Sequence, residues 1–351
     1  MAEFISFQPS DYYSTKLYTG NGSTQSITGV GFQPDLVWIK NRAAADNHCI
    51  ADAARGDQGA SYKYIYPDGN WEQSAADATF LTSLDADGFT VGSADRNNAN
   101  TEALVSWNWK GGTTVVPSGG TITPSACSFS TTNGFGIYEY GGNGTSGATI
   151  AHGLGATPQF MIVKRIDTSA AWMVYHQGMG NTKYMSLDTD IAEATSASAW
   201  NDTSPTSTLF YLGDGGNVNN GSGTYVAYVF APIKGYSKFG YYTGNGNNDG
   251  PFLYTGFRPN FVMIKRLSGG DNGWAMWDVK RNTYNPMDNN IQAQWDYGEN
   301  EVDAGDIDVV SNGFKIVVTD NDTNVSDYPY IYMAFAEFPI VSSNDVPTVA
   351  R

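Results

Sequence analysis

The feature that most constrains the fold is a short phrase that occurs three times along the chain. In each copy a proline is followed by one polar residue, four apolar residues and a lysine. The three copies are Pro34–Lys40, Pro158–Lys164 and Pro259–Lys265. The copies lie roughly 100–125 residues apart, which is the size of a small domain and too long for a solenoid unit. The chain is therefore predicted to contain three copies of one domain.

Each copy carries the same series of strand and turn signals. An Asn-Gly turn, typical of tight hairpins, precedes the proline-led phrase at residues 21–22, 143–144 and 245–246. Four consecutive apolar residues then predict a strand that is covered on both faces at the centre of a sheet. Each copy closes on an aromatic strand, at residues 104–109, 225–230 and 330–335. The pattern predicts an all-β fold of three tandem antiparallel β-sandwiches of the jelly-roll type.

These signals also set the predicted domain boundaries. The sandwiches are placed at residues 17–110, 134–232 and 238–336, between an N-terminal arm (1–16) and a C-terminal extension (337–351). Residues 111–133 are rich in Gly, Ser, Thr and Pro, which predicts a linker that lets the first sandwich move independently. The joint between the second and third sandwiches is short, which predicts a fixed pair.

Composition excludes several classes of function. The net charge of −16 argues against nucleic-acid binding, which needs a basic surface, and against docking on anionic membranes. No run approaches the roughly 20 apolar residues of a membrane span, so no membrane insertion is predicted. No signal peptide is recognised at the N-terminus. Cys49 and Cys127 are predicted to be free thiols, which fits assembly in a reducing cytoplasm.

The sequence predicts no enzyme. Its three histidines, His48, His152 and His176, accompany no Gly-x-Ser-x-Gly motif. A pair of catalytic carboxylates is an alternative in an Asp-rich chain, but the acids differ between the copies. No cofactor is predicted.

The Asx-rich loops are weak candidates for calcium. They begin at Asp95, Asp214 and Asp320, and oxygen ligands suit this ion. Their spacing differs between copies, and the favoured interpretation is that Asp and Asn bond their own backbone in turns. No metal site is predicted.

Two further features are candidate contacts. The lysines that end the three phrases are expected to reach solvent or to lie over an aromatic neighbour. Trp71, in a long loop, is interpreted either as a contact residue or as local packing.

Both ends of the chain carry apolar side chains outside the repeat. Each such side chain left in water forgoes roughly 1.5–3 kcal/mol. The ends are therefore predicted to make assembly contacts in a homo-oligomer, with a trimer favoured, while strand addition at the closing strands is a further route. The alternative is that both ends fold back on their own domains. The predicted assembly contacts are Phe4, Phe7, Tyr12, Tyr13, Phe338, Ile340 and Val341.

The order of these phrases resembles a tandem domain of unknown function encoded by tailed bacteriophages, many of them marine. The resemblance rests on Tyr18–Gly22 with Gly31–Lys40, on Ala151–Gly155, on Gly235–Gly246 and on Tyr330–Glu337, and it covers the chain from about residue 14. It implies a non-enzymatic structural protein of the virion, assembled in the host cytoplasm. A tail fibre, tip or adhesin part is the favoured interpretation. The alternatives are a capsid decoration protein and a carbohydrate-binding or depolymerase module. The implied partners are other virion proteins and, as an alternative, a host surface glycan.

Overall fold

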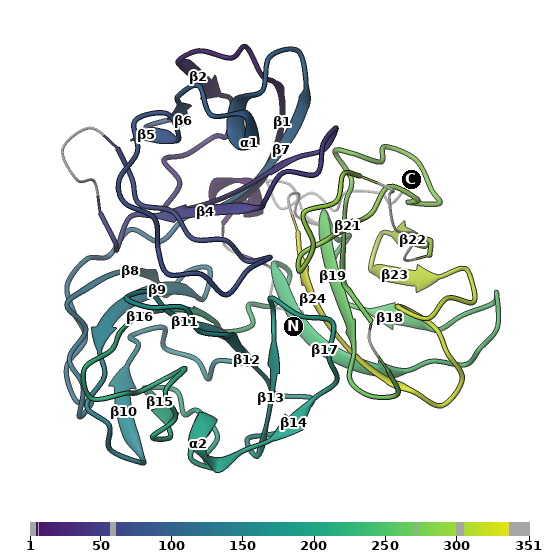
Figure 1. Cartoon of the computed structure of the whole chain (residues 1–351). Helices are drawn as coiled ribbons and strands as arrows, with labels where there is room; N and C mark the ends of the chain where they lie inside the picture. The colour runs from purple at the N-terminus through teal and green to yellow at the C-terminus, as the bar shows by residue number, and fades with distance from the viewer. Residues whose placement is uncertain (1–4, 6, 57–60, 271, 300–304, 337–351) are drawn as a thin grey trace.

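The protein is an all-β molecule of three sandwiches arranged around a common centre (Figure 1). The computed structural model describes residue 5 and residues 7–336, apart from 57–60, 271 and 300–304. Strands make up 39% of the chain and helices 3%, so the predicted fold class is confirmed. The helical pieces are single turns: η1 (Pro9–Asp11), α1 (Asp95–Asn98) and α2 (Ala197–Trp200).

The first sandwich pairs a larger sheet, in the order β1-β7-β3-β4, with a smaller sheet, in the order β2-β6-β5. Its strands are β1 (Tyr13–Thr19), β2 (Gln25–Thr28), β3 (Leu36–Asn41), β4 (Cys49–Asp52), β5 (Leu81–Asp85), β6 (Gly88–Val91) and β7 (Ala103–Trp109).

The second sandwich has a seven-stranded sheet, β14-β13-β12-β11-β16-β9-β8, and a smaller sheet, β10-β15. Its strands are β8 (Ala126–Ser130), β9 (Phe135–Gly141), β10 (Ala148–Ala151), β11 (Phe160–Arg165), β12 (Trp172–His176), β13 (Lys183–Ser186), β14 (Ala194–Thr195), β15 (Leu209–Leu212) and β16 (Thr224–Phe230).

The third sandwich has a larger sheet, β17-β24-β19-β20-β21, and a smaller sheet, β18-β23-β22. Its strands are β17 (Ser237–Thr243), β18 (Phe252–Tyr254), β19 (Phe261–Arg266), β20 (Trp274–Asp278), β21 (Ile291–Gln292), β22 (Ile307–Val310), β23 (Gly313–Ile316) and β24 (Pro329–Phe335).

The proline-led strands β3, β11 and β19 lie inside the larger sheets, as predicted. Their side chains alternate between two cores, because successive residues of a strand point to opposite faces. In β3, Val37 and Ile39 pack into the first sandwich, whereas Leu36 and Trp38 face the centre of the molecule. Strands β11 and β19 divide their side chains in the same way. Four apolar residues in a row therefore serve a sheet that is covered on both faces.

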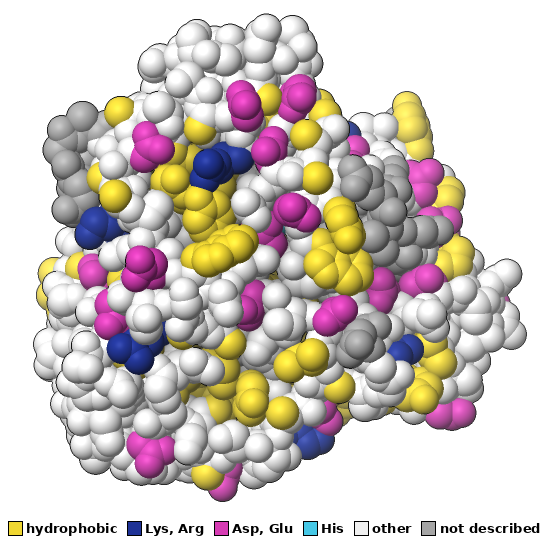
Figure 2. All heavy atoms as spheres, in the orientation of Figure 1, with side chains coloured by type: hydrophobic (Ala, Val, Ile, Leu, Met, Phe, Trp, Pro, Cys, Tyr) yellow, Lys and Arg dark blue, Asp and Glu magenta, His cyan; other side chains and the backbone are white. Residues whose placement is uncertain are grey.

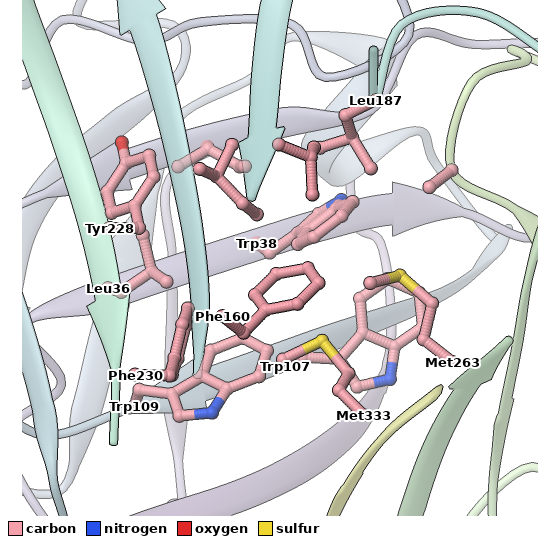
Figure 3. Close-up of a cluster of buried hydrophobic side chains, with 14 of the residues drawn as sticks. Leu36, Trp38, Trp107, Trp109, Phe160, Leu187, Tyr228, Phe230, Met263 and Met333 are labelled. Carbon is pink, nitrogen blue, oxygen red and sulfur yellow. The ribbon is translucent and has the colours of Figure 1, made fainter. Parts of the chain in front are cut away.

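The side chains that face inward form one core shared by all three sandwiches, here called the central core. Figure 3 shows Trp38, Phe160 and Met263, one from each sandwich, within this cluster. The ring of Trp109 lies 6.3 Å from that of Phe230 and 5.7 Å from that of Phe335, so it touches both other sandwiches. An apolar cavity of about 20 Å³ remains at the centre, room for little more than one water-sized sphere. The three sandwiches thus form a closed ring.

The expectation of an independently moving first sandwich is wrong. Within residues 111–133, β8 pairs with β9 and extends the second sandwich's larger sheet. The Ile122 amide donates to the Thr149 carbonyl at 2.9 Å, which covers the edge of β10. The Ser128 hydroxyl donates to the Asp35 carboxylate of the first sandwich at 2.7 Å. The segment behaves as part of two sandwiches, so its Gly- and Ser-rich composition misled the prediction.

The closing strands do not offer free edges. Strand β7 lies between β1 and β3, β16 between β11 and β9, and β24 between β17 and β19. The predicted strand addition at these strands is therefore wrong, because both edges of each are already hydrogen-bonded within the chain.

Candidate interaction sites

All three histidines are buried and used in structural hydrogen bonds. In each, Nδ1 accepts an N–H group, from the Trp38 indole in His48 and from the Leu154 amide in His152. His176 accepts from the Gly178 amide, and its Nε2 faces the Tyr332 carbonyl of the third sandwich at 3.3 Å. Burial lowers the pKa of each ring, that of His176 to about 4. Their arrangement serves packing, since no histidine side chain reaches the surface.

The Asx-rich loops form turns that are pinned by buried asparagines. Asn98, Asn219 and Asn324 are fully buried, and each accepts the amide of the asparagine in the preceding Asn-Gly turn at 2.8–2.9 Å. Each side-chain amide also donates to backbone carbonyls of its own sandwich.

Sequence reasoning missed these asparagines, although one signal marks them. Each stands eleven residues before the last aromatic residue of its closing strand, Trp109, Phe230 or Phe335.

The three calcium candidates lie in different settings. Asp95 begins α1, Asp214 is exposed, and the Asp320 carboxylate accepts the Asp322 amide at 2.7 Å. Among the described residues, no three His, Cys, Asp or Glu side chains are grouped to hold a metal ion.

The repeated lysines join neighbouring sandwiches. Lys40, Lys164 and Lys265 are fully buried, so the expectation that they reach solvent is wrong. The Lys164 ammonium donates to the Asn70 carbonyl in a loop of the first sandwich at 2.9 Å. Lys265 donates in the same way to Asp190 of the second sandwich at 2.6 Å, and Lys40 to Asp296 of the third at 3.0 Å. The second expectation is confirmed for Lys164 and Lys265, whose ammonium groups lie over the rings of Trp172 and Trp274.

Backbone hydrogen bonds repeat this cyclic pattern. Each bond runs from the loop of one sandwich to the residue two positions after the lysine of its neighbour. The three bonds are Gln73 N–H to Ile166 O at 3.1 Å, Glu193 N–H to Leu267 O at 2.8 Å and Glu299 N–H to Arg42 O at 2.8 Å. One type of contact thus closes all three junctions of the ring.

A second set of buried groups differs between copies. Strands β4 and β20 end on Asp52 and Asp278, and each acid pairs with an arginine three residues later, Arg55 or Arg281. The Tyr228 hydroxyl of the second sandwich donates to Asp52 at 2.7 Å.

The Trp107 indole of the first sandwich donates to Asp278 in the same way, at 3.1 Å. In the second sandwich, His176 stands in place of the acid and Met179 in place of the arginine. The strand register places Met333 of the third sandwich at the position that the donors Trp107 and Tyr228 occupy in the other two. At the junction of the second and third sandwiches, both the acid–arginine pair and the side chain that donates to it are therefore replaced.

Large apolar side chains are exposed on the loops that follow the lysine contacts. Trp71, Ile191 and Tyr297 come directly after the carbonyls that accept from the lysines, and they are 48%, 44% and 42% exposed. Because the three loops hold equivalent places in the ring, these side chains lie at one end of it. Figure 2 shows groups of hydrophobic side chains around the middle of one face, with Asp and Glu between them. Trp71 also packs locally, with its ring 5.4 Å from that of Tyr66, which confirms the local-packing interpretation, while its role as a contact residue stays a prediction.

The predicted assembly residues have different surroundings. Tyr13 belongs to β1 and is fully buried in the central core, so it is unavailable to a neighbouring molecule. Phe7 and Tyr12 pack on the central core as partly buried residues, with the Phe7 ring 5.5 Å from that of Tyr236. Phe4, Phe338, Ile340 and Val341 lie outside the described residues.

Cys49 and Cys127 are free, as predicted, and both are buried. In the part of the chain that the structure describes, no helix has the length and hydropathy of a membrane span.

Comparisons with known proteins give a family but no activity. A stretch of 97 residues, 26% of this chain, is 35% identical to halomucin of Haloquadratum walsbyi, and the match covers 1% of that protein. No solved structure matches the chain. The model of a family described as a domain of unknown function, DUF7483, matches residues 8–339. The chain therefore belongs to the DUF7483 family.

Proposed function

We propose that this chain is a non-enzymatic structural component of a tailed bacteriophage virion, in a tail fibre, tip or adhesin. The observation that carries the proposal is the closed ring, in which the buried lysines, His176 and the acid–arginine pairs make contacts between sandwiches. Groups that an enzyme would direct at a substrate are used here for rigidity. The virion context rests on the resemblance of the repeated phrases to phage-encoded tandem domains.

The proposed assembly surface is the end of the ring that carries Trp71, Ile191 and Tyr297. Half-exposed apolar side chains at three equivalent places suit contact with a neighbouring virion protein. The proposal includes a trimer of this chain, and light scattering on the purified chain tests it.

Localisation in the virion tests the main proposal. Immunogold labelling and electron microscopy of purified virions should place the protein in the tail. Labelling on the head would favour the capsid-decoration alternative, and virions without the protein would contradict the proposal altogether. In the same particles, the variant Trp71→Ser/Ile191→Ser/Tyr297→Ser should fold but fail to be incorporated, whereas the control Tyr284→Ser should be incorporated. Tyr284 is a suitable control because it is 84% exposed and precedes Asn285, whose side chain donates to the Val309 carbonyl on β22 and not to a residue at a lysine junction.

The absence of an enzyme is tested on purified protein. No reducing sugar should be released from host polysaccharide. Release that disappears on mutation of one Asp or Glu would favour the depolymerase alternative.

A further inference from the structure

The three smaller sheets are equivalent in fold, but their outer faces differ in chemistry. In the first sandwich, the outer face carries the small polar residues Ser26, Thr28 and Thr90, and hydroxyl hydrogen bonds of 2.7–2.9 Å link Ser26, Thr90 and Asp85. In the second, residues 121–122 of the chain cover β10, where Thr149 and Ala151 are buried.

The third sandwich has aromatic residues at these same positions. By strand register, Phe252 and Tyr254 correspond to Ser26 and Thr28, and they are 49% and 60% exposed. Figure 1 shows their sheet, β18-β23-β22, on the outer side of the third sandwich, away from the centre of the ring. The exposed aromatic pair is therefore specific to the third sandwich and does not follow from the fold that the three copies share.

The face presents two aromatic side chains on one strand, and the Tyr254 ring has a cationic neighbour. Phe252 and Tyr254 stand two residues apart on one strand, or about 6.7 Å. Tyr254 is paired with Gly313, which adds no side chain beside it. The Lys238 ammonium lies 5.7 Å from the centre of the Tyr254 ring, a cation–π contact that fixes the ring's orientation.

The charges on and around this face cancel. Lys315 is paired with Phe252 across the strands and forms an ion pair with Asp249, while Asp308 follows on the next strand. With Lys238 there are two lysines and two aspartates, so the formal charge of the face is zero. A polyanion would in addition be repelled by a chain of net charge −16.

The size of the aromatic pair argues against a protein partner. Two fully buried aromatic side chains contribute about 300–500 Å², and these two are already half-covered. A stable protein interface buries about 800 Å² on each side. A chain of sugar rings needs less, because the apolar C–H face of a pyranose packs on an aromatic ring while its hydroxyl groups bond to neighbouring polar side chains.

We propose that the outer face of β18-β23-β22 binds a neutral polysaccharide. Phe252 and Tyr254 stack on successive sugar rings, and Lys238, Lys315 and Asp308 bind their hydroxyl groups. The inference deepens the adhesin role proposed above by naming the class of ligand, and it rests on that role only for its biological setting.

Binding of the full-length protein to a microarray of bacterial surface polysaccharides, with soluble dextran and mannan in affinity gels, tests the proposal. At least one neutral polysaccharide should bind, insensitively to salt. Phe252→Ala and Tyr254→Ala should each weaken binding about tenfold or more. The matched control Tyr241→Ala, also an exposed aromatic residue of the third sandwich but on β17 of the larger sheet, should leave it unchanged. Circular dichroism confirms that each variant is folded.

Three outcomes would overturn the proposal. They are no binding to any neutral polysaccharide, binding that survives Phe252→Ala/Tyr254→Ala, and binding to acidic polysaccharides only that is lost in high salt. Self-association that the same double variant abolishes would instead assign the face to a second copy. Immunogold labelling separates the two proposals, because the double variant should still enter the virion if the structural role is correct.

Discussion

Besides the lysines, a second set of residues at the sandwich junctions occupies one repeated position, the end of the strand after the proline-led strand. Asp52 and Asp278 each hold a buried arginine there, whereas His176 holds none. A buried acid needs its partner, because an uncompensated charge in a low-dielectric interior is costly. A neutral histidine needs only hydrogen bonds. The two solutions differ in how they respond to mutation and to pH.

Replacing one member of a buried ion pair should lower the free energy of unfolding more than replacing both members by neutral residues. Arg55→Met leaves the Asp52 carboxylate buried, so the free energy of unfolding should fall by about 3–5 kcal/mol. Asp52→Asn/Arg55→Met removes both charges and keeps an acceptor for the Tyr228 hydroxyl, so it should be less destabilised, with a coupling energy of about 1–3 kcal/mol. Urea unfolding of both variants measures the difference. A double variant no more stable than Arg55→Met would refute this account of the pair.

His176 should make the protein sensitive to mild acid. Its folded pKa of about 4 lies below the ordinary value of 6.5, so between these values the unfolded state binds the extra proton. Its contribution is complete above pH 6.5 and should fall by about 3 kcal/mol as the pH drops to 4. Burial raises the pKa of Asp68 to about 6, which opposes this trend equally in any variant. Unfolding between pH 4 and 7 should show a shallower dependence for His176→Gln than for the unmodified chain. Equal slopes would exclude His176 as the source.

At the level of elements, local patterns predicted the strands but not their partners. The proline-led phrases predicted β3, β11 and β19 as central strands because four apolar residues need cover on both faces. What covers the second face is another sandwich, which no local pattern specifies. The same limit explains the error at residues 111–133, where composition predicted mobility but contacts with Thr149 and Asp35 hold the segment.

Hydrogen exchange should show that this segment is structured. The amides of Ile122, Ser125 and Phe129 all donate to backbone carbonyls at 2.8–3.0 Å. They should exchange roughly 100-fold or more slowly than the amide of Gly119, for which no such bond is found among the described residues. Exchange of all four amides at the same fast rate would restore the linker interpretation.

At the scale of the molecule, the ring is the result that sequence reasoning did not reach. The recurrence of Lys40, Lys164 and Lys265 was visible, but a lysine at a strand end predicts solvent, and only the neighbouring loop's carbonyls explain its burial. The exposed residues of the proposed binding surfaces have the same limit, because only the three-dimensional contacts reveal them. Trp71 stands out in the sequence, but its equivalence with Ile191 and Tyr297 requires the lysine contacts that align the three loops. Phe252 and Tyr254 carry no motif, and only the register with Ser26 and Thr28 marks them.

The shared central core predicts that three sandwiches unfold as one unit. Sandwiches that met only through polar contacts would melt separately, whereas a common apolar core couples them. Trp109 belongs to the first sandwich but packs on Phe230 and Phe335 of the other two, so Trp109→Ala should cost about 3–5 kcal/mol and lower the melting temperature of the whole molecule. Trp200→Ala, in the second sandwich's own core, is the control for a buried tryptophan outside the central core. Calorimetry should give one transition for the unmodified chain, with agreement between van't Hoff and calorimetric enthalpies. Three resolved transitions, with only the first shifted by Trp109→Ala, would mean that the sandwiches are independent domains and that the central core does not bind them together.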